Sequence, residues 1–131
     1  MRGTYILSIR INQNKKIQVG KLGEIYFKKG YYFYIGSALN SLEKRIKRHY
    51  DKNKKIHWHI DFLLKFGKIF NVYYKEGNKK IECEIAEKFN QNYSKINDFG
   101  CSDCKCESHL FYSLNNDISK LIKSLDMKKF N

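Results

Sequence analysis

The chain has 131 residues, which fits one domain and excludes two domains that each have their own hydrophobic core. Its 26 lysines and arginines exceed its 13 aspartates and glutamates, and the formal net charge of +13 favours a polyanionic partner such as nucleic acid. An AT-rich coding bias toward Lys, Ile and Asn is the alternative explanation of that charge. No apolar run reaches the roughly 20 residues that cross a bilayer, and the N-terminus lacks the apolar segment of a signal peptide. We therefore expect a cytoplasmic protein without a membrane partner.

The N-terminal part of the chain predicts strands that lead into a helix. Apolar residues alternate between residues 3 and 11, and the aromatic run YYFYIG begins at Tyr31; both patterns are typical of half-buried strands. Ser41 stands where it can cap a helix that begins at Leu42. Three strands are expected before this helix: residues 3–11, residues 31–36, and between them the short apolar pieces 17–19 and 24–27.

The rest of the chain predicts mainly helices. Because the hairpin strands come first and the helices later, we expect an α+β fold in which helices cover a small, mostly antiparallel sheet. One domain is expected over residues 1–115, followed by a peripheral helix or tail over 116–131. The later helices are expected at 58–66, 80–92 and 118–125, with a strand at 69–75.

Two tyrosines at strand positions are the first candidate functional residues. Tyr5 and Tyr34 belong to strands that can lie side by side, so both phenols could reach one surface. Gly36 is expected to end its strand and to let a substrate approach the backbone closely. Because the chain has ten tyrosines, ordinary packing on the sheet is the alternative explanation.

The helix after Ser41 carries a basic face. Arg48 and His49 follow Arg45 by three and four residues and therefore share one side of the helix with it. A guanidinium group suits phosphate because it binds two oxygens at once and stays charged. A solvated helix face is the alternative.

Glu82 is the third candidate. On a helical wheel it falls within the apolar arc that contains Ile85 and Phe89. A carboxylate on an apolar face is costly unless it is paired or holds a cation, so Glu82 is a candidate ligand for a hard metal ion such as Mg²⁺. A frayed helix with Glu82 in solvent is the alternative.

Together these residues resemble the GIY-YIG nuclease superfamily. The matching segments are GTY at 3–5, YIGSA at 34–38 and EKRIKRH at 43–49, followed by the helix that bears a glutamate. HWHIDFLL and FGCSDCKCESHLFY further resemble a small archaeal and bacterial GIY-YIG family, whose members stand alone or are fused to DNA-repair domains. Three features depart from the pattern: Thr4 replaces an apolar residue, Ser37 replaces a basic one, and Asn92, Ser94 and Asn97 compete for a downstream Asn.

The resemblance implies a DNA endonuclease, a phosphodiester hydrolase that uses Mg²⁺ or Mn²⁺ in DNA repair or processing. RNA as substrate, a homodimer and a repair-protein partner all remain open. Tyr5 and Tyr34 would position or activate the attacking water, although a phenol acts as a base at neutral pH only if its pKa falls well below about 10. Arg45 would hold the scissile phosphate, Glu82 would hold the metal and His49 would assist. The residues expected to contact DNA are Lys44, Lys47, Arg48, His57 and His59.

Two rival functions follow from the same sequence. The first is a non-catalytic nucleic-acid-binding module of the same fold. The second is a small interaction protein stabilised by Zn²⁺, in which Cys83 with His57 or His59 would complete the site. The alternative for the cysteine-rich segment is a buried turn with Asp103 as a cap. The zinc ligands expected in that segment are Cys101, Cys104, Cys106 and His109.

Overall fold

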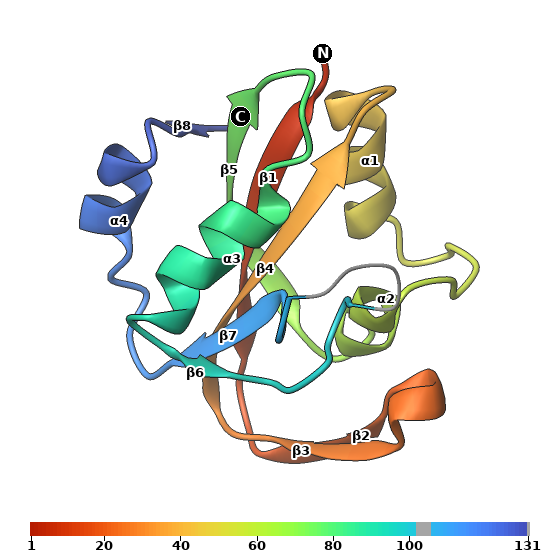
Figure 1. The fold of residues 1–131 in the computed structure, drawn as a ribbon. Helices are drawn as coiled ribbons and strands as arrows, with labels where there is room; N and C mark the ends of the chain where they lie inside the picture. The colour runs from red at the N-terminus through yellow and green to blue at the C-terminus, as the bar shows by residue number, and fades with distance from the viewer. Residues whose placement is uncertain (102–105, 131) are drawn as a thin grey trace.

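The structure is a computed structural model that describes residues 1–101 and 106–130. The described residues form a six-stranded antiparallel sheet in the order β6-β7-β4-β1-β5-β8, a separate two-stranded ribbon of β2 and β3, and four helices (Figure 1). This confirms the predicted α+β class with a mostly antiparallel sheet. The strands of the large sheet are β1 (Gly3–Ile11), β4 (Gly30–Ala38), β5 (Lys68–Glu76), β6 (Ser94–Lys95), β7 (Leu110–Ser113) and β8 (Lys128–Lys129). The remaining elements are β2 (Lys15–Gln18), the 3-10 turn η1 (Gly20–Leu22), β3 (Glu24–Phe27), α1 (Leu42–Tyr50), α2 (His59–Leu63), α3 (Glu82–Asn90) and α4 (Ser119–Ser124).

Strand β1 is the centre of the sheet and pairs with β4 on one side and β5 on the other. Its sequence alternation predicted a strand buried on one face, but helices cover both faces, so β1 is buried along nearly its whole length. Tyr5 and Leu7 face one hydrophobic cluster, whereas Ile6 faces the other. The sheet therefore separates two cores.

Helices α1 and α2 lie on one side of the sheet, and α3 and α4 lie on the other (Figure 1). Ser41 caps α1 as predicted, because its hydroxyl accepts a hydrogen bond from the backbone N–H of Lys44. Leu42 and Ile46 of α1 pack into the first core, and Ile85 of α3 packs into the second. The first turns of α1 and α3 both lie near the end of β4 that carries Ser37, because Arg45 and Glu82 each form a hydrogen bond with this serine.

The C-terminal segment 116–131, expected to be a peripheral tail, contributes to the second core over its described residues. Ile118, Ile122 and Leu125 recur at helical spacing on one face of α4 and are buried against the sheet. Strand β8 then pairs with β5 and extends the sheet.

Strand β7 was not predicted and forms the other flank of β4. It follows the cysteine-rich segment directly, and its four residues are too few to show a period of their own. Helix α2 covers only residues 59–63 of the longer helix that was expected. Within the described part of the chain, no helix is both long and apolar enough to cross a membrane.

Candidate functional site

A cleft of about 660 Å³ opens at the C-terminal end of β4, between α1, α2 and the first turn of α3. Residues that lie far apart in the sequence converge there. Helix α1 packs on one face of the sheet and α3 on the other, and the first turns of both contact Ser37 near the end of β4. The polar residues that line this cleft include Tyr5, Tyr34, Ser37, Arg45, Glu82 and His109.

Tyr5 and Tyr34 project from the same face of adjacent strands. Tyr5 is opposite Gly36 and Leu7 is opposite Tyr34 in the β1–β4 register, which places the two ring centroids 6.4 Å apart. Gly36 does not end its strand, since β4 continues to Ala38. Its role is to leave room for Tyr5, because a Cβ at Gly36 would lie 2.5 Å from the Tyr5 hydroxyl oxygen.

Both phenols are buried at the base of the cleft, with exposed fractions of 1% for Tyr5 and 9% for Tyr34. Burial raises the pKa of each phenol above its usual value, and the nearby charge of Arg45 lowers it by less. Arg45 therefore does not bring either phenol into the neutral pH range. At neutral pH both tyrosines are hydrogen-bonding phenols, not resting phenolates.

His49 lies beneath Tyr5 and is 2% exposed. Its Nε2 is 2.6 Å from the Tyr5 hydroxyl oxygen, and its buried Nδ1 has no hydrogen-bond partner within the described residues. A buried N–H without a partner costs more free energy than a buried lone pair without one. We therefore infer that the proton of the neutral imidazole is on Nε2 and that this N–H donates a hydrogen bond to the Tyr5 hydroxyl oxygen. The Tyr5 hydroxyl can then donate its own proton into the cleft.

We expect His49 to make the protein sensitive to mild acid. Burial, supported by the positive charges of Arg45 and Arg48, lowers the pKa of His49 from 6.5 to about 3. Between these values the unfolded chain binds a proton at this residue and the folded chain does not. The free energy of unfolding should therefore decrease as the pH falls from about 6.5 toward about 3, by up to about 1.4 kcal/mol per pH unit. Urea unfolding from about pH 7 to about pH 4.5 measures this slope, and the His49→Gln variant should lose it. Parallel pH curves for the two proteins would contradict the expectation.

Arg45 lies at the mouth of the cleft, on the first turn of α1. Its Nη1 donates to the backbone carbonyl of Ser37 at 3.0 Å, and its guanidinium lies 4.5 Å from the centre of the Trp58 ring. These two contacts hold the planar group in place while it remains partly exposed. Such a fixed guanidinium can bind two oxygens of one phosphate group.

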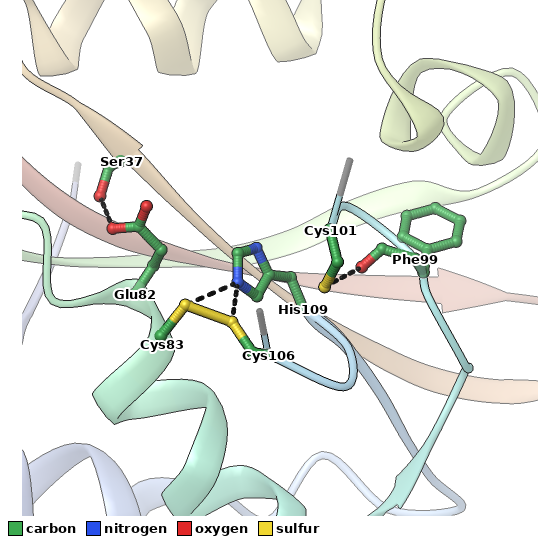
Figure 2. The surroundings of a disulfide bond; sticks show 7 residues. All are labelled: Ser37, Glu82, Cys83, Phe99, Cys101, Cys106 and His109. Carbon is green, nitrogen blue, oxygen red and sulfur yellow. Dashed lines mark hydrogen bonds between the residues drawn. A yellow bond between two sulfur atoms is a disulfide. The ribbon is translucent and has the colours of Figure 1, made fainter. Parts of the chain in front are cut away.

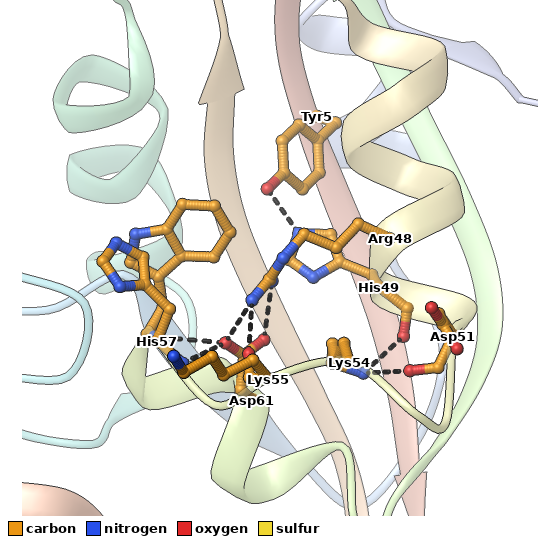
Figure 3. A network of polar contacts seen from close by, with 9 residues as sticks. Tyr5, Arg48, His49, Asp51, Lys54, Lys55, His57 and Asp61 are labelled. Atoms are coloured by element: carbon orange, nitrogen blue, oxygen red, sulfur yellow. Dashed lines mark hydrogen bonds and ion pairs between the residues drawn. The ribbon is translucent and has the colours of Figure 1, made fainter.

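Arg48, also expected to bind a neighbouring DNA phosphate, lines the cleft, and its guanidinium is paired within the protein. Both of its terminal nitrogens donate to Asp61 at 2.9 Å, and one also donates to the Lys55 carbonyl (Figure 3). Asp61 further accepts the backbone N–H groups of His57 and Trp58, so this network ties α1 to α2. Arg48 therefore supports the wall of the cleft.

Glu82 is the first residue of α3 and lines the cleft. One of its carboxylate oxygens accepts a hydrogen bond from the Ser37 hydroxyl. Because Arg45 donates to the carbonyl of the same serine, Ser37 connects the guanidinium to the carboxylate. The result is an oxygen-donor group beside a cationic group, the chemistry that Mg²⁺ or Mn²⁺ and a phosphate would need.

The other residues expected to contact DNA differ in position. Lys44 is exposed and lines the cleft, whereas Lys47 is exposed outside it. His57 and His59 both line the cleft. His59 Nδ1 accepts the backbone N–H of Gly100, and burial lowers its pKa.

The predicted zinc ligands are only partly brought together. Cys104 lies outside the described residues, and Cys101 donates to the Phe99 carbonyl. Cys106 and His109 are grouped with Cys83, and Cys83 and Cys106 form a disulfide bond in this structure. The expected pairing of Cys83 with His57 or His59 is therefore not observed.

Ser37 and Trp58 are parts of the site that were not predicted from the sequence. Ser37 directly follows Gly36 in the segment YIGSA, and its contacts with both Arg45 and Glu82 depend on the tertiary fold. Trp58 contacts two guanidinium groups, since Arg45 lies 4.5 Å and Arg48 4.3 Å from the centre of its ring. The single tryptophan of a basic chain was the available signal.

The fold and the cleft define a basic α+β domain whose site combines phenols, a guanidinium and a carboxylate. The chain belongs to the family described as domain of unknown function DUF123, whose model matches residues 4–129. No curated protein and no solved structure matches the chain.

Proposed function

We propose that this protein is a GIY-YIG-type endonuclease that hydrolyses a phosphodiester bond of DNA with one divalent cation. The observation that carries the proposal is the convergence of Tyr5, Tyr34, Arg45 and Glu82, from β1, β4, α1 and α3, on one cleft. The formal charge of +13 supports a polyanionic substrate.

Arg45 is the residue proposed to hold the scissile phosphate. Its contacts with Ser37 and Trp58 fix the guanidinium before substrate arrives, so little reorganisation is needed when charge develops on the phosphate oxygens. Lys44, exposed at the same mouth, would hold an adjacent phosphate and make binding sensitive to salt.

Glu82 and Ser37 are the residues proposed to hold the cation. A carboxylate and a hydroxyl are hard oxygen donors, and Mg²⁺ in nuclease-like sites needs only one or two carboxylates in addition to water and substrate phosphate. A cation bound there would acidify a coordinated water and stabilise charge on the phosphate.

The tyrosines are proposed to orient the attacking water as neutral phenols. His49 accepts no proton at neutral pH, because its pKa lies near 3, and it donates its Nε2–H to Tyr5. The Tyr5 and Tyr34 hydroxyls can then direct hydrogen bonds into the cleft without themselves becoming charged.

The burial of both phenols also favours a second candidate, a non-catalytic DNA-binding module of the same fold. Incubation with labelled duplex, branched, nicked and single-stranded DNA, and with a matched RNA, in the presence of Mg²⁺ or Mn²⁺, tests the two. Metal-dependent cleavage of a DNA substrate supports the nuclease. Salt-sensitive binding without cleavage of any substrate would favour the module.

The Arg45→Gln variant should lower cleavage by roughly 10²–10³-fold, as expected for loss of a group that stabilises transition-state charge. Lys47→Gln on the same helix removes one positive charge outside the cleft and is the matched control. Single-turnover rates at saturating protein separate the loss of cleavage from the loss of binding. Equal rates for the two variants would contradict the role given to Arg45.

A further inference from the structure

Three soft or borderline metal ligands gather next to Glu82, on the side of α3 that faces the segment before β7. The ligand atoms of Cys83, Cys106 and His109 all lie within 4.8 Å of one another. Figure 2 shows that His109 directs its ring toward both sulfur atoms: Nε2 is 2.9 Å from Cys106 Sγ and 3.6 Å from Cys83 Sγ. The nuclease chemistry proposed above uses none of these three side chains.

The 3.6 Å between His109 Nε2 and Cys83 Sγ already fits a tetrahedral centre, whereas the 2.9 Å to Cys106 Sγ and the distance between the two sulfurs would have to lengthen. With Zn–S near 2.3 Å and Zn–N near 2.0 Å, neighbouring ligand atoms in such a centre lie roughly 3.5–3.8 Å apart. His109 is 5% exposed, so its ring is held in this orientation by the surrounding packing. Reduction of the disulfide would allow the sulfurs to move apart by side-chain rotation, with His109 Nε2 already facing both.

We propose that in the reduced protein Cys83, Cys106 and His109 bind one Zn²⁺, at a site separate from the Glu82 carboxylate. A dithiol reductant supplies two electrons and two protons to the disulfide and becomes a disulfide itself. Zn²⁺ then displaces the two thiol protons to solvent and binds the two thiolates together with the neutral imidazole. The fourth tetrahedral position is left for a ligand outside these three residues.

The zinc site has a positioning role, because Cys83 directly follows Glu82 in the first turn of α3. That turn has Ile81 at its N-cap, and among the described residues no side-chain hydrogen bond caps it. A link from Cys83 to Cys106 and His109 compensates for the missing cap by fixing the start of the helix to the neighbouring segment. Either the disulfide or zinc can provide this link, and only the thiolate form can bind the metal.

The test is the metal content of protein that carries no His tag, purified in reductant and then dialysed. We expect one zinc per chain, and with Co²⁺ in place of zinc we expect the near-ultraviolet absorption of cobalt–thiolate bonds. Cys83→Ser and His109→Gln should lose the metal, whereas Cys101→Ser, a cysteine of the same segment outside the three ligands, should retain it. Oxidation of the wild type with diamide should release the zinc, and reductant should restore binding.

Two results would overturn the assignment: no stoichiometric zinc in the reduced wild type, or the same loss of zinc from Cys101→Ser as from Cys83→Ser. If Cys83→Ser fails to fold, the cobalt spectrum of the wild type before and after diamide decides the question. DNA cleavage does not enter any of these measurements, so failure of the zinc site and failure of the nuclease proposal are distinguishable.

Discussion

Glu82→Gln is expected to reduce metal-dependent DNA cleavage by roughly a thousandfold, since a catalytic metal contributes several kcal/mol of transition-state stabilisation. Glutamine keeps the shape of the side chain and can still accept the hydrogen bond from Ser37. What it loses is the negative charge that would attract the cation. The variant should therefore fold normally and bind DNA with nearly unchanged affinity.

Glu84→Gln is the matched control, because Glu84 is an exposed acid in the same turn of α3. The rate of cleavage should be measured over a range of Mg²⁺ and Mn²⁺ concentrations, with DNA binding followed separately by fluorescence anisotropy in Ca²⁺. Cleavage that persists undiminished in Glu82→Gln would show that a contaminant or another residue is responsible. A loss of equal size in Glu84→Gln would show that the effect is general charge and not metal binding.

The strongest local signals in the sequence predicted the elements that build the cleft. Alternation in β1, the aromatic run in β4 and the Ser41 cap of α1 all act within a few residues, so they are readable without the fold. Strands β7 and β8 are four and two residues long. They exist because β4 and β5 offer unpaired edges, and this is a tertiary property.

The candidate site was predictable in its members but not in its contacts. Helical spacing predicted Glu82 as an acid on an apolar face, whereas in the structure it is the first residue of α3, where its carboxylate accepts a hydrogen bond from the Ser37 hydroxyl. Arg48 is an arginine on the same face of α1 as Arg45, so the sequence alone gives it the features of a phosphate-binding side chain. Its actual partner, Asp61, is 13 positions later in the sequence, and helical spacing cannot reveal such a pair.

Asp61→Ala is expected to lower the free energy of unfolding by about 3–5 kcal/mol, the usual effect of breaking a buried ion pair. The Asp61 side chain has an exposed fraction of 0%, and it is the shared acceptor for the Arg48 guanidinium and two backbone N–H groups (Figure 3). Burial alone would raise the pKa of Asp61, but these hydrogen bonds outweigh burial and hold the pKa below its usual value of 3.8. The carboxylate therefore stabilises the fold above about pH 3.8, and this contribution is lost as the pH falls through the lowered pKa.

The loss should appear in urea unfolding at neutral pH as a lower midpoint with an unchanged slope. Asp61→Asn keeps one carbonyl acceptor for the backbone N–H groups but loses the charge that pairs with Arg48, so its destabilisation should lie between those of the wild type and Asp61→Ala. Glu87→Ala, an exposed acid on α3, should change the free energy of unfolding by less than about 0.5 kcal/mol. Because Asp61 holds α1 against α2, its removal should also loosen the wall that positions Trp58, and the fluorescence of this single tryptophan should change in the folded variant. An Asp61→Ala protein with wild-type stability would mean that Arg48 finds another partner and that the network is not needed to form the cleft.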